Sequence, residues 1–130
     1  MIKMEDVMAH RSRAMNPANP FIKGTAQNPD VFFQGREASN KYYMQVPEVV
    51  KAKMKAFASL TGRTYNLFDY YGHPEAESII IIMGSGAGPV QEIVDYLNAN
   101  GGKTGVVIVR LYRPFAIDDF VHAIPSTVTK

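Results

Sequence analysis

The feature that most constrains this chain is a pair of apolar runs separated by one helical pattern. The first run, SIIIIM at residues 78–83, and the second, GVVIVRL at residues 105–111, are β-branched at most positions. Runs that are apolar on both faces are typical of strands covered by helices on both sides of a parallel sheet. Apolar residues recur at helical spacing between them, from Val90 to Leu97. Residues 78–111 therefore predict a strand–helix–strand unit of the α/β class.

A glycine-rich turn follows the first run and raises the question of a phosphate site. The dinucleotide-binding pattern G-x-G-x-x-G is matched by Gly84 and Gly86, but Pro89 stands at its third glycine position and Gly88 comes one residue early. No acidic residue ends the second run, as a ribose would require. We interpret the turn as structural, because glycines let the chain reverse and let the helix approach the strand. A phosphate site formed by Gly84, Ser85, Gly86 and Gly88 at the helix N-terminus is the alternative.

The rest of the chain is divided by proline and glycine. Residues 46–61 predict an amphipathic helix that Gly62 ends, and residues 64–74 predict a strand closed by a Gly-His-Pro turn. A short helix is predicted at residues 1–13, and another at residues 116–124. The proline-rich stretch Asn16 to Asp30 predicts an extended connector, which passes at Pro29 either into a helix or into an irregular loop.

Composition and charge exclude several classes of protein. The chain has 130 residues, a hydrophobic content of 46%, 14 basic and 12 acidic residues, and no cysteine. Its nearly balanced charge argues against a nucleic-acid surface or a polybasic membrane patch. Without cysteine it forms no disulfide, cysteine-ligated iron–sulfur cluster or thiolate nucleophile. The apolar runs are too short to cross a bilayer, and the first residues lack the apolar core of a signal peptide, so a cytoplasmic protein is expected.

Candidate catalytic and metal-binding residues are few. His10, His73 and His122 are far apart and have no metal-ligand spacing, so surface or capping roles are expected. Asp118 and Asp119 lie in the first turn of a helix, where they complement its dipole. Ser85 lacks the G-x-S-x-G spacing of a nucleophile elbow. The residues alone predict no catalytic group and no metal ligand.

Longer sequence patterns point to a known family. AHRSRAMNPANPFIKGTAQNPDVFFQGREASNKYY at residues 9–43, LTGRTYNLFDYYGHPEAESIIIIMGSG at residues 60–86 and VRLYRPF at residues 109–115 resemble the pyruvate:ferredoxin (flavodoxin) oxidoreductases. The resemblance covers nearly the whole chain in the same order, and GTAQNPDVFFQ and RLYRPF are its most characteristic parts. Gly88-Pro89 departs from the pattern, which concerns only the geometry of that turn.

This resemblance implies a large enzyme that oxidatively decarboxylates pyruvate to acetyl-coenzyme A and passes electrons to ferredoxin or flavodoxin. It implies thiamine diphosphate, Mg²⁺, coenzyme A and [4Fe–4S] clusters for the parent enzyme. Neither the thiamine-diphosphate signature nor any cluster cysteine occurs in this chain, so no catalytic or cofactor-binding residue is carried over. Residues 1–73 resemble the end of the first thiamine-binding-type domain and its linker. Residues 74–130 resemble the start of the second domain, which is similar to the transketolase C-terminal domain.

The expected fold is therefore a partial three-layer α/β/α parallel sheet preceded by a helical, proline-rich region. Such a sheet needs more strands than the three predicted here, because its strands require cover on both faces and pairing at both edges. We expect a chain that is inactive alone, weakly stable or oligomeric, and dependent on the remaining domains of the parent enzyme. Two alternatives stay open: a small nucleotide- or phosphate-binding module, and a non-catalytic partner of a split oxidoreductase. Arg110 and Arg113 are expected to play structural roles beside a strand end.

Overall fold

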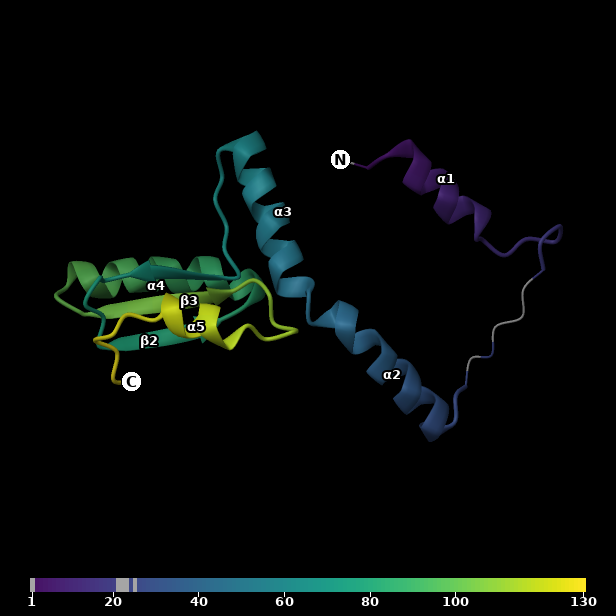
Figure 1. Cartoon of the computed structure of the whole chain (residues 1–130). Helices are drawn as coiled ribbons and strands as arrows, with labels where there is room; N and C mark the ends of the chain where they lie inside the picture. Colours follow the sequence, from purple (N-terminus) through teal and green to yellow (C-terminus); the bar gives the residue numbers. More distant parts are fainter. Residues whose placement is uncertain (1, 21–23, 25) are drawn as a thin grey trace. The chain divides into compact units, whose positions relative to one another are not determined.

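The computed structural model describes residues 2–20, 24 and 26–130, which form two compact units, Met1–Ala38 and Ser39–Lys130. Part of the predicted connector, at residues 21–23 and 25, lies outside the described residues. The helices are α1 (Met4–Ser12), α2 (Pro29–Tyr43), α3 (Val46–Thr61), α4 (Ala87–Ala99) and α5 (Ile117–Ala123), with a short 3-10 helix η1 (Gly84–Gly86). The strands are β1 (Phe68–Gly72), β2 (Ser78–Ile82) and β3 (Thr104–Val109) (Figure 1).

The first unit contains α1 and the beginning of α2. α1 confirms the predicted N-terminal helix, although Met4 and Met8 on its apolar side are exposed. At Pro29 the chain is helical rather than irregular. The N–H of Phe32 donates to the Asn28 carbonyl 2.9 Å away, which forms the first turn. Pro29 has no N–H group, but at the start of a helix this group would have had no intrahelical partner. Phe32 and Phe33 of α2 are exposed.

The second unit is built on a three-stranded sheet in the order β1-β3-β2. β2 and β3 are parallel, with Ile80 opposite Val106, which confirms the strand–helix–strand unit. β1 pairs antiparallel with β3, with Phe68 opposite Val109, so the sheet is mixed where a parallel one was expected. The reason lies in the link between β1 and β2, residues 73–77, because a parallel return needs a crossover of about a dozen residues or more.

Helices cover both faces of this sheet, so the expected three layers are present. On one face Val94 of α4 is buried against Val106 and Ile108 of β3. On the other face a cluster of Leu67, Phe68, Val107 and Val109 packs against α3 and α5, including Val50, Met54 and Phe120. Alternate residues of β3 thus enter two separate cores, as the pleat of a strand requires. Figure 1 shows α4 and α5 on opposite sides of the strands.

β2 differs from the expectation of a strand covered on both faces. Ile80 is 48% exposed and Ile81 is 53% exposed, whereas Val106 and Val107 of β3 are 0% exposed. β2 lies at the edge of the sheet, and α4 packs mainly over β3 and β1, with Ile82 at the border of that core. Only one of the two apolar runs is therefore enclosed by this chain.

Two glycines have roles that no other residue could fill without strain. Gly62 ends α3 with φ 74°, and its N–H donates to the Ala58 carbonyl 2.8 Å away, as predicted for a helix C-cap. Gly105 lies under the ring of Tyr70, where an added Cβ would stand 2.3 Å from the Tyr70 hydroxyl oxygen. Within the described part of the chain, no helix is both long and apolar enough to cross a membrane.

Candidate functional site

The glycine turn between β2 and α4 is the candidate site that sequence reasoning singled out. Gly84 adopts φ 82°, a left-handed conformation that favours glycine, and opens the 3-10 turn η1. Gly86 lies against β2, since an added Cβ would stand 2.9 Å from Cδ1 of Ile82. A Cβ on Gly88 would meet open space. The glycines at 84 and 86 therefore serve the turn and the approach of helix to strand, which is the structural interpretation.

A shallow hollow of about 580 Å³ adjoins this turn at the carboxyl ends of β2 and β3. In α/β sheets ligands commonly bind beyond the carboxyl ends of the strands. The hollow is lined by Met83, Gly84, Ala87, Gln91 and residues 108–110. Of the four candidate residues only Gly84 reaches it, so the structure does not bring Ser85, Gly86 and Gly88 together into a phosphate cradle there.

Arg110 borders this hollow, but its guanidinium group is engaged elsewhere. Its Nε donates to Asp69 of β1, and the guanidinium carbon lies 4.5 Å from the centroid of the Tyr65 ring. The second carboxylate oxygen of Asp69 accepts from the backbone and side-chain nitrogens of Asn66, at 3.1 and 2.9 Å. The Tyr65 ring also stacks on Phe57 of α3 at 6.1 Å. Arg110 thus joins the end of β3 to β1 and to the loop before it, which matches its expected structural role.

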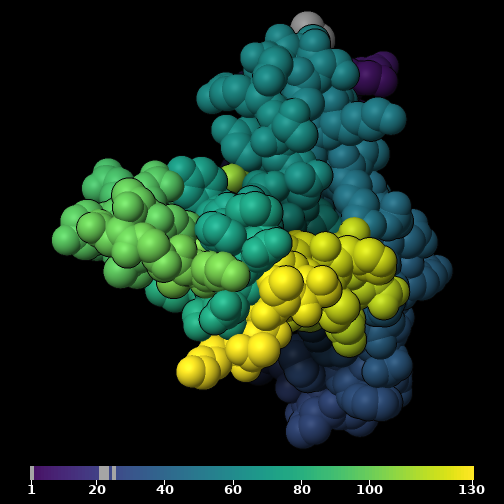
Figure 2. All heavy atoms as spheres, turned by 90° about the vertical axis from the view of Figure 1, so that its left-hand side faces the viewer, coloured from purple at the N-terminus to yellow at the C-terminus, as the bar shows by residue number. Residues whose placement is uncertain are grey.

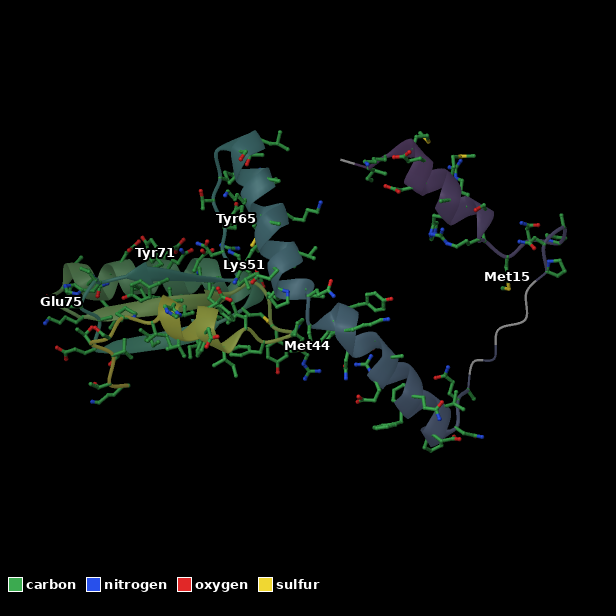
Figure 3. The ribbon with its side chains drawn as sticks, in the orientation of Figure 1. Met15, Met44, Lys51, Tyr65, Tyr71 and Glu75 are labelled. Atoms are coloured by element: carbon green, nitrogen blue, oxygen red, sulfur yellow. The ribbon has the colours of Figure 1, made fainter. Side chains whose placement is uncertain are left out.

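A larger pocket, of about 680 Å³, lies between α3, residues 64–67 and α5. Lys51 of α3 lines it, with Nζ 2.8 Å from Oδ2 of Asp119 and 2.9 Å from Oε1 of Glu48. The hydrogen bonds to Asp119 and Glu48 raise the pKa of Lys51 above its ordinary 10.5, so its ammonium stays charged and is no general base. Figure 3 shows Lys51 and Tyr65 beside α3, where it meets the sheet. Sequence reasoning missed this pocket, because the partners Lys51 and Asp119 are far apart in the sequence.

The two tyrosines of β1, Tyr70 and Tyr71, make structural contacts. Burial raises the pKa of Tyr70, whose hydroxyl donates to the carbonyl of His73. The Tyr71 hydroxyl donates to both carboxylate oxygens of Asp95 on α4, at 2.8 and 2.9 Å, and this hydrogen bond raises the pKa of Tyr71. Both phenols therefore stay protonated near neutral pH, and their hydrogen bonds fix β1 to the turn after it and to α4.

The histidines and the paired aspartates lie in turns and helix ends. Nδ1 of His73 accepts from the backbone N–H of Glu75 at 3.0 Å, and Nδ1 of His122 lies 2.6 Å from the Asp118 carbonyl oxygen. Asp118 and Asp119 occupy the first turn of α5. Among the residues that the structure describes, no three His, Asp or Glu side chains gather closely enough to hold a metal ion.

The RLYRPF motif at residues 110–115 becomes part of the core around α5. The Arg113–Pro114 bond is cis. The ring of Phe115 lies 5.3 Å from that of Phe68 and 5.2 Å from that of Phe120, in a cluster of three aromatic rings. Leu111 packs against the same core. The motif is explained by packing between the end of β3 and α5.

The sequence of this chain is similar to those of known pyruvate oxidoreductases. A family model described as pyruvate:ferredoxin oxidoreductase core domain II matches residues 76–127. The chain is 56% identical over 128 residues to a pyruvate-flavodoxin oxidoreductase of Rhodospirillum rubrum, covering 98% of the chain. It is 56% identical over 126 residues to that of Trichormus variabilis, covering 97% of the chain. It is 45% identical over its whole length to a pyruvate:ferredoxin oxidoreductase of Moorella thermoacetica. The chain spans about 11% of the length of these relatives.

Proposed function

Because the chain belongs to the pyruvate:ferredoxin (flavodoxin) oxidoreductase family, we propose that it is a structural and interdomain part of such an enzyme, inactive alone. The parent enzyme would decarboxylate pyruvate oxidatively to acetyl-coenzyme A and reduce ferredoxin or flavodoxin. The observation that carries this proposal is the match of 45–56% identity over 97% or more of the chain. The structure supports the structural role, because the interactions around Arg110, Lys51 and Tyr71 join elements of the fold.

We further propose a domain boundary near residues 73 and 74. Residues 1–73 would contribute the end of the first domain and its linker, and residues 74–130 the start of the second. Support comes from the family model, whose match begins at residue 76. The sheet extends across this boundary, because β1 precedes it and pairs with β3. The linker would thus be anchored to the second domain by a strand.

The cofactors of the parent enzyme are assigned to its other parts. Thiamine diphosphate, Mg²⁺, coenzyme A and [4Fe–4S] clusters are the groups that this family implies. Cluster iron needs cysteine thiolates, and the sequence contains no cysteine. The residues present do not fit an iron–sulfur cluster, and the described side chains form no cluster of metal ligands for Mg²⁺.

The partners that this proposal names are the remaining domains of the parent enzyme, which would cover the apolar side chains now exposed on β2, α2 and α4. Ferredoxin or flavodoxin would be partners of the parent enzyme as a whole. We also propose that the parent enzyme is a homo-oligomer and lies in the cytoplasm.

A chimeric enzyme tests the proposed function. The matched segment of the Rhodospirillum rubrum enzyme would be replaced by this chain, and pyruvate- and coenzyme A-dependent reduction of methyl viologen would be measured. We expect the chimera to retain activity and the isolated chain to show none. A matched insert carrying Val94→Asp, which places a charge in the α4 core, should abolish activity. A folded chimera without pyruvate oxidation would contradict the proposal.

The hollow beside Gly84 supports a second, weaker candidate, a phosphate-binding module. The observation in favour is that Gly84, Ala87 and Gln91 line it where α4 begins. Titration of the isolated chain with nicotinamide, flavin and coenzyme A ligands tests it. Micromolar binding that Gln91→Ala weakens would support the module, and no binding at millimolar ligand would exclude it.

A further inference from the structure

The link between α4 and β3 contains the sequence Asn100-Gly101, and Asn100 is the only one of the chain's seven asparagines that precedes glycine. The backbone nitrogen that follows an asparagine attacks the carbonyl carbon of its side chain when the two come into contact. Glycine favours this step, because it has no Cβ to block the approach and moves freely. Asn100 and Gly101 are both exposed, and Figure 2 shows the residues of α4 and of the link after it, in light green, at the surface.

The other six asparagines are less suited to this reaction. Three precede proline, whose nitrogen carries no proton to release, and three precede residues that have a Cβ. The first three are Asn16, Asn19 and Asn28, and the others are Asn40, Asn66 and Asn98. Nδ2 of Asn66 is also held, because it donates to Asp69 at 2.9 Å.

The folded link holds Asn100 in a conformation that does not react directly. Its Nδ2 donates to the Tyr96 carbonyl at 2.7 Å, and the N–H of Gly101 donates to the Asn98 carbonyl at 3.1 Å. Ring closure needs Cβ of Asn100 and the Gly101 nitrogen on the same side of the Cα–C bond, which ψ 22° does not provide. The last turn of α4 must therefore open first, and helix ends open locally more easily than the whole fold.

A set of hydrogen bonds between Asn98 and Thr104 keeps this turn closed. Thr104 donates its backbone N–H and its hydroxyl to Oδ1 of Asn98, at 2.9 and 3.0 Å. Nδ2 of Asn98 donates to the Thr104 carbonyl at 2.9 Å. These three bonds, named here the Asn98–Thr104 clasp, tie the end of α4 to the start of β3 on either side of Asn100.

We propose that Asn100-Gly101 is a site of spontaneous covalent modification, at which Asn100 is deamidated when the last turn of α4 opens, at a rate set by the Asn98–Thr104 clasp. The Gly101 nitrogen gives its proton to hydroxide and bonds to Cγ of Asn100. The Cγ–Nδ2 bond breaks, and ammonia leaves with a proton taken from water. The product is a five-membered succinimide ring. The reaction needs no oxidant or reductant, and the inference does not depend on the proposed function.

Water opens this ring in two ways, and both products change the link into β3. Addition at Cγ gives aspartate at position 100, which replaces the donor to the Tyr96 carbonyl by a carboxylate. A negative charge is unfavourable there, because it lies at the C-terminus of α4. Addition at the backbone carbonyl gives isoaspartate, in which the main chain runs through the side chain and is longer by one carbon. The altered link leads directly into β3, the central strand of the sheet.

Mass spectrometry of the incubated chain tests the site. The chain and a peptide that copies residues 95–105 are kept in the same warm, mildly alkaline buffer. Conversion is then measured at each asparagine, with isoaspartate detected by enzymatic methylation. In the chain, conversion should appear first at Asn100 and should be slower than in the peptide by about tenfold or more. Earlier conversion of another asparagine, or a rate at Asn100 equal to that of the peptide, would overturn the proposal. No conversion at Asn100 after about a hundred half-lives of the peptide would also overturn it.

Substitutions in the Asn98–Thr104 clasp test what sets the rate. Asn98→Ala removes all three bonds and should speed deamidation of Asn100 by about fivefold or more. Thr104→Val removes only the hydroxyl bond and should speed it by about twofold or more, which keeps the test decisive if Asn98→Ala does not fold. Circular dichroism shows which variants are folded. Unchanged rates in the folded variants would overturn the role of the clasp.

Two further variants serve as controls. Gly62→Ala weakens the fold at the end of α3 and leaves the clasp intact, so the rate at Asn100 should stay unchanged. Acceleration by Gly62→Ala equal to that by Asn98→Ala would mean that Asn100 reacts from the fully unfolded chain, and would overturn the proposal. Asn100→Gln should abolish conversion at this position, because its longer side chain would have to close a six-membered ring. Conversion of the link in Asn100→Gln at the original rate would overturn the succinimide route.

Discussion

Truncation of Val94 to alanine measures how firmly α4 is held on the sheet. Val94 is 1% exposed and is the buried residue of α4, in contact with Val106 and Ile108. Removing its two methyl groups costs about 1.6 kcal/mol in transfer free energy. The cavity left behind raises this to about 2.5 kcal/mol, and the better helix propensity of alanine returns about 0.5 kcal/mol. The expected loss in the free energy of unfolding is therefore about 2 kcal/mol.

Ile93→Ala is the matched control for this substitution. Ile93 neighbours Val94 on the same helix but is 55% exposed, and its replacement gains the same helix propensity. Its expected effect on the isolated chain is about 0.5 kcal/mol or less. Urea unfolding followed by far-ultraviolet circular dichroism compares the two, and Val94→Ala should also lower the melting temperature by roughly 8–16 °C. Equal losses for both variants would refute the assignment of Val94 as the anchor of α4.

Three further predictions follow from single residues. Gly105→Ala should lower the free energy of unfolding by about 1–3 kcal/mol, because its Cβ would overlap the Tyr70 ring, and a Tyr70→Ala background should relieve much of this cost in thermal melts. Gly62→Ala should cost about 1 kcal/mol because Gly62 has φ 74°, whereas Gly88→Ala in the first turn of α4 should be neutral or slightly stabilising in the same assay. The ion pairs of Lys51 contribute fully to the free energy of unfolding below pH 10.5, and this contribution is lost as the pH rises through the raised pKa of Lys51 in the folded chain. Above that pH, the urea midpoint should therefore fall less in Lys51→Met than in the unchanged chain.

The parts of the fold that depend on local pattern could be predicted from the sequence. The β-branched run that became β3, the helical spacing from Val90 to Leu97, and the cap at Gly62 act through neighbours in the chain or through burial on both faces. The antiparallel pairing of β1 with β3 was not predicted, because it depends both on the short link of residues 73–77, which reverses the chain, and on which strands become neighbours. β1 and β2 follow one another in sequence, yet β3 lies between them.

The candidate site was predicted only as far as local geometry reaches. Gly84 and Gly86 form a turn, as their spacing indicated, because φ 82° and the closeness of Ile82 are local requirements. The pairs Arg110–Asp69 and Lys51–Asp119 join segments distant in the chain, and no sequence pattern marks one charged residue as the partner of another. The larger pocket beside α3 was missed for the same reason.

The position of β3 at the centre of the sheet has a consequence for how the polypeptide matures during synthesis. β1 and β2 leave the ribosome first, but they are not hydrogen-bonded neighbours and have nothing to pair with until residues 104–109 emerge. Until then the nascent chain carries two strand-forming segments without a partner strand, and the segment that forms β2 is the more apolar of the two. This interval is when a ribosome-associated chaperone would have most to shield, and a translational pause shortly before residue 104 would prolong it.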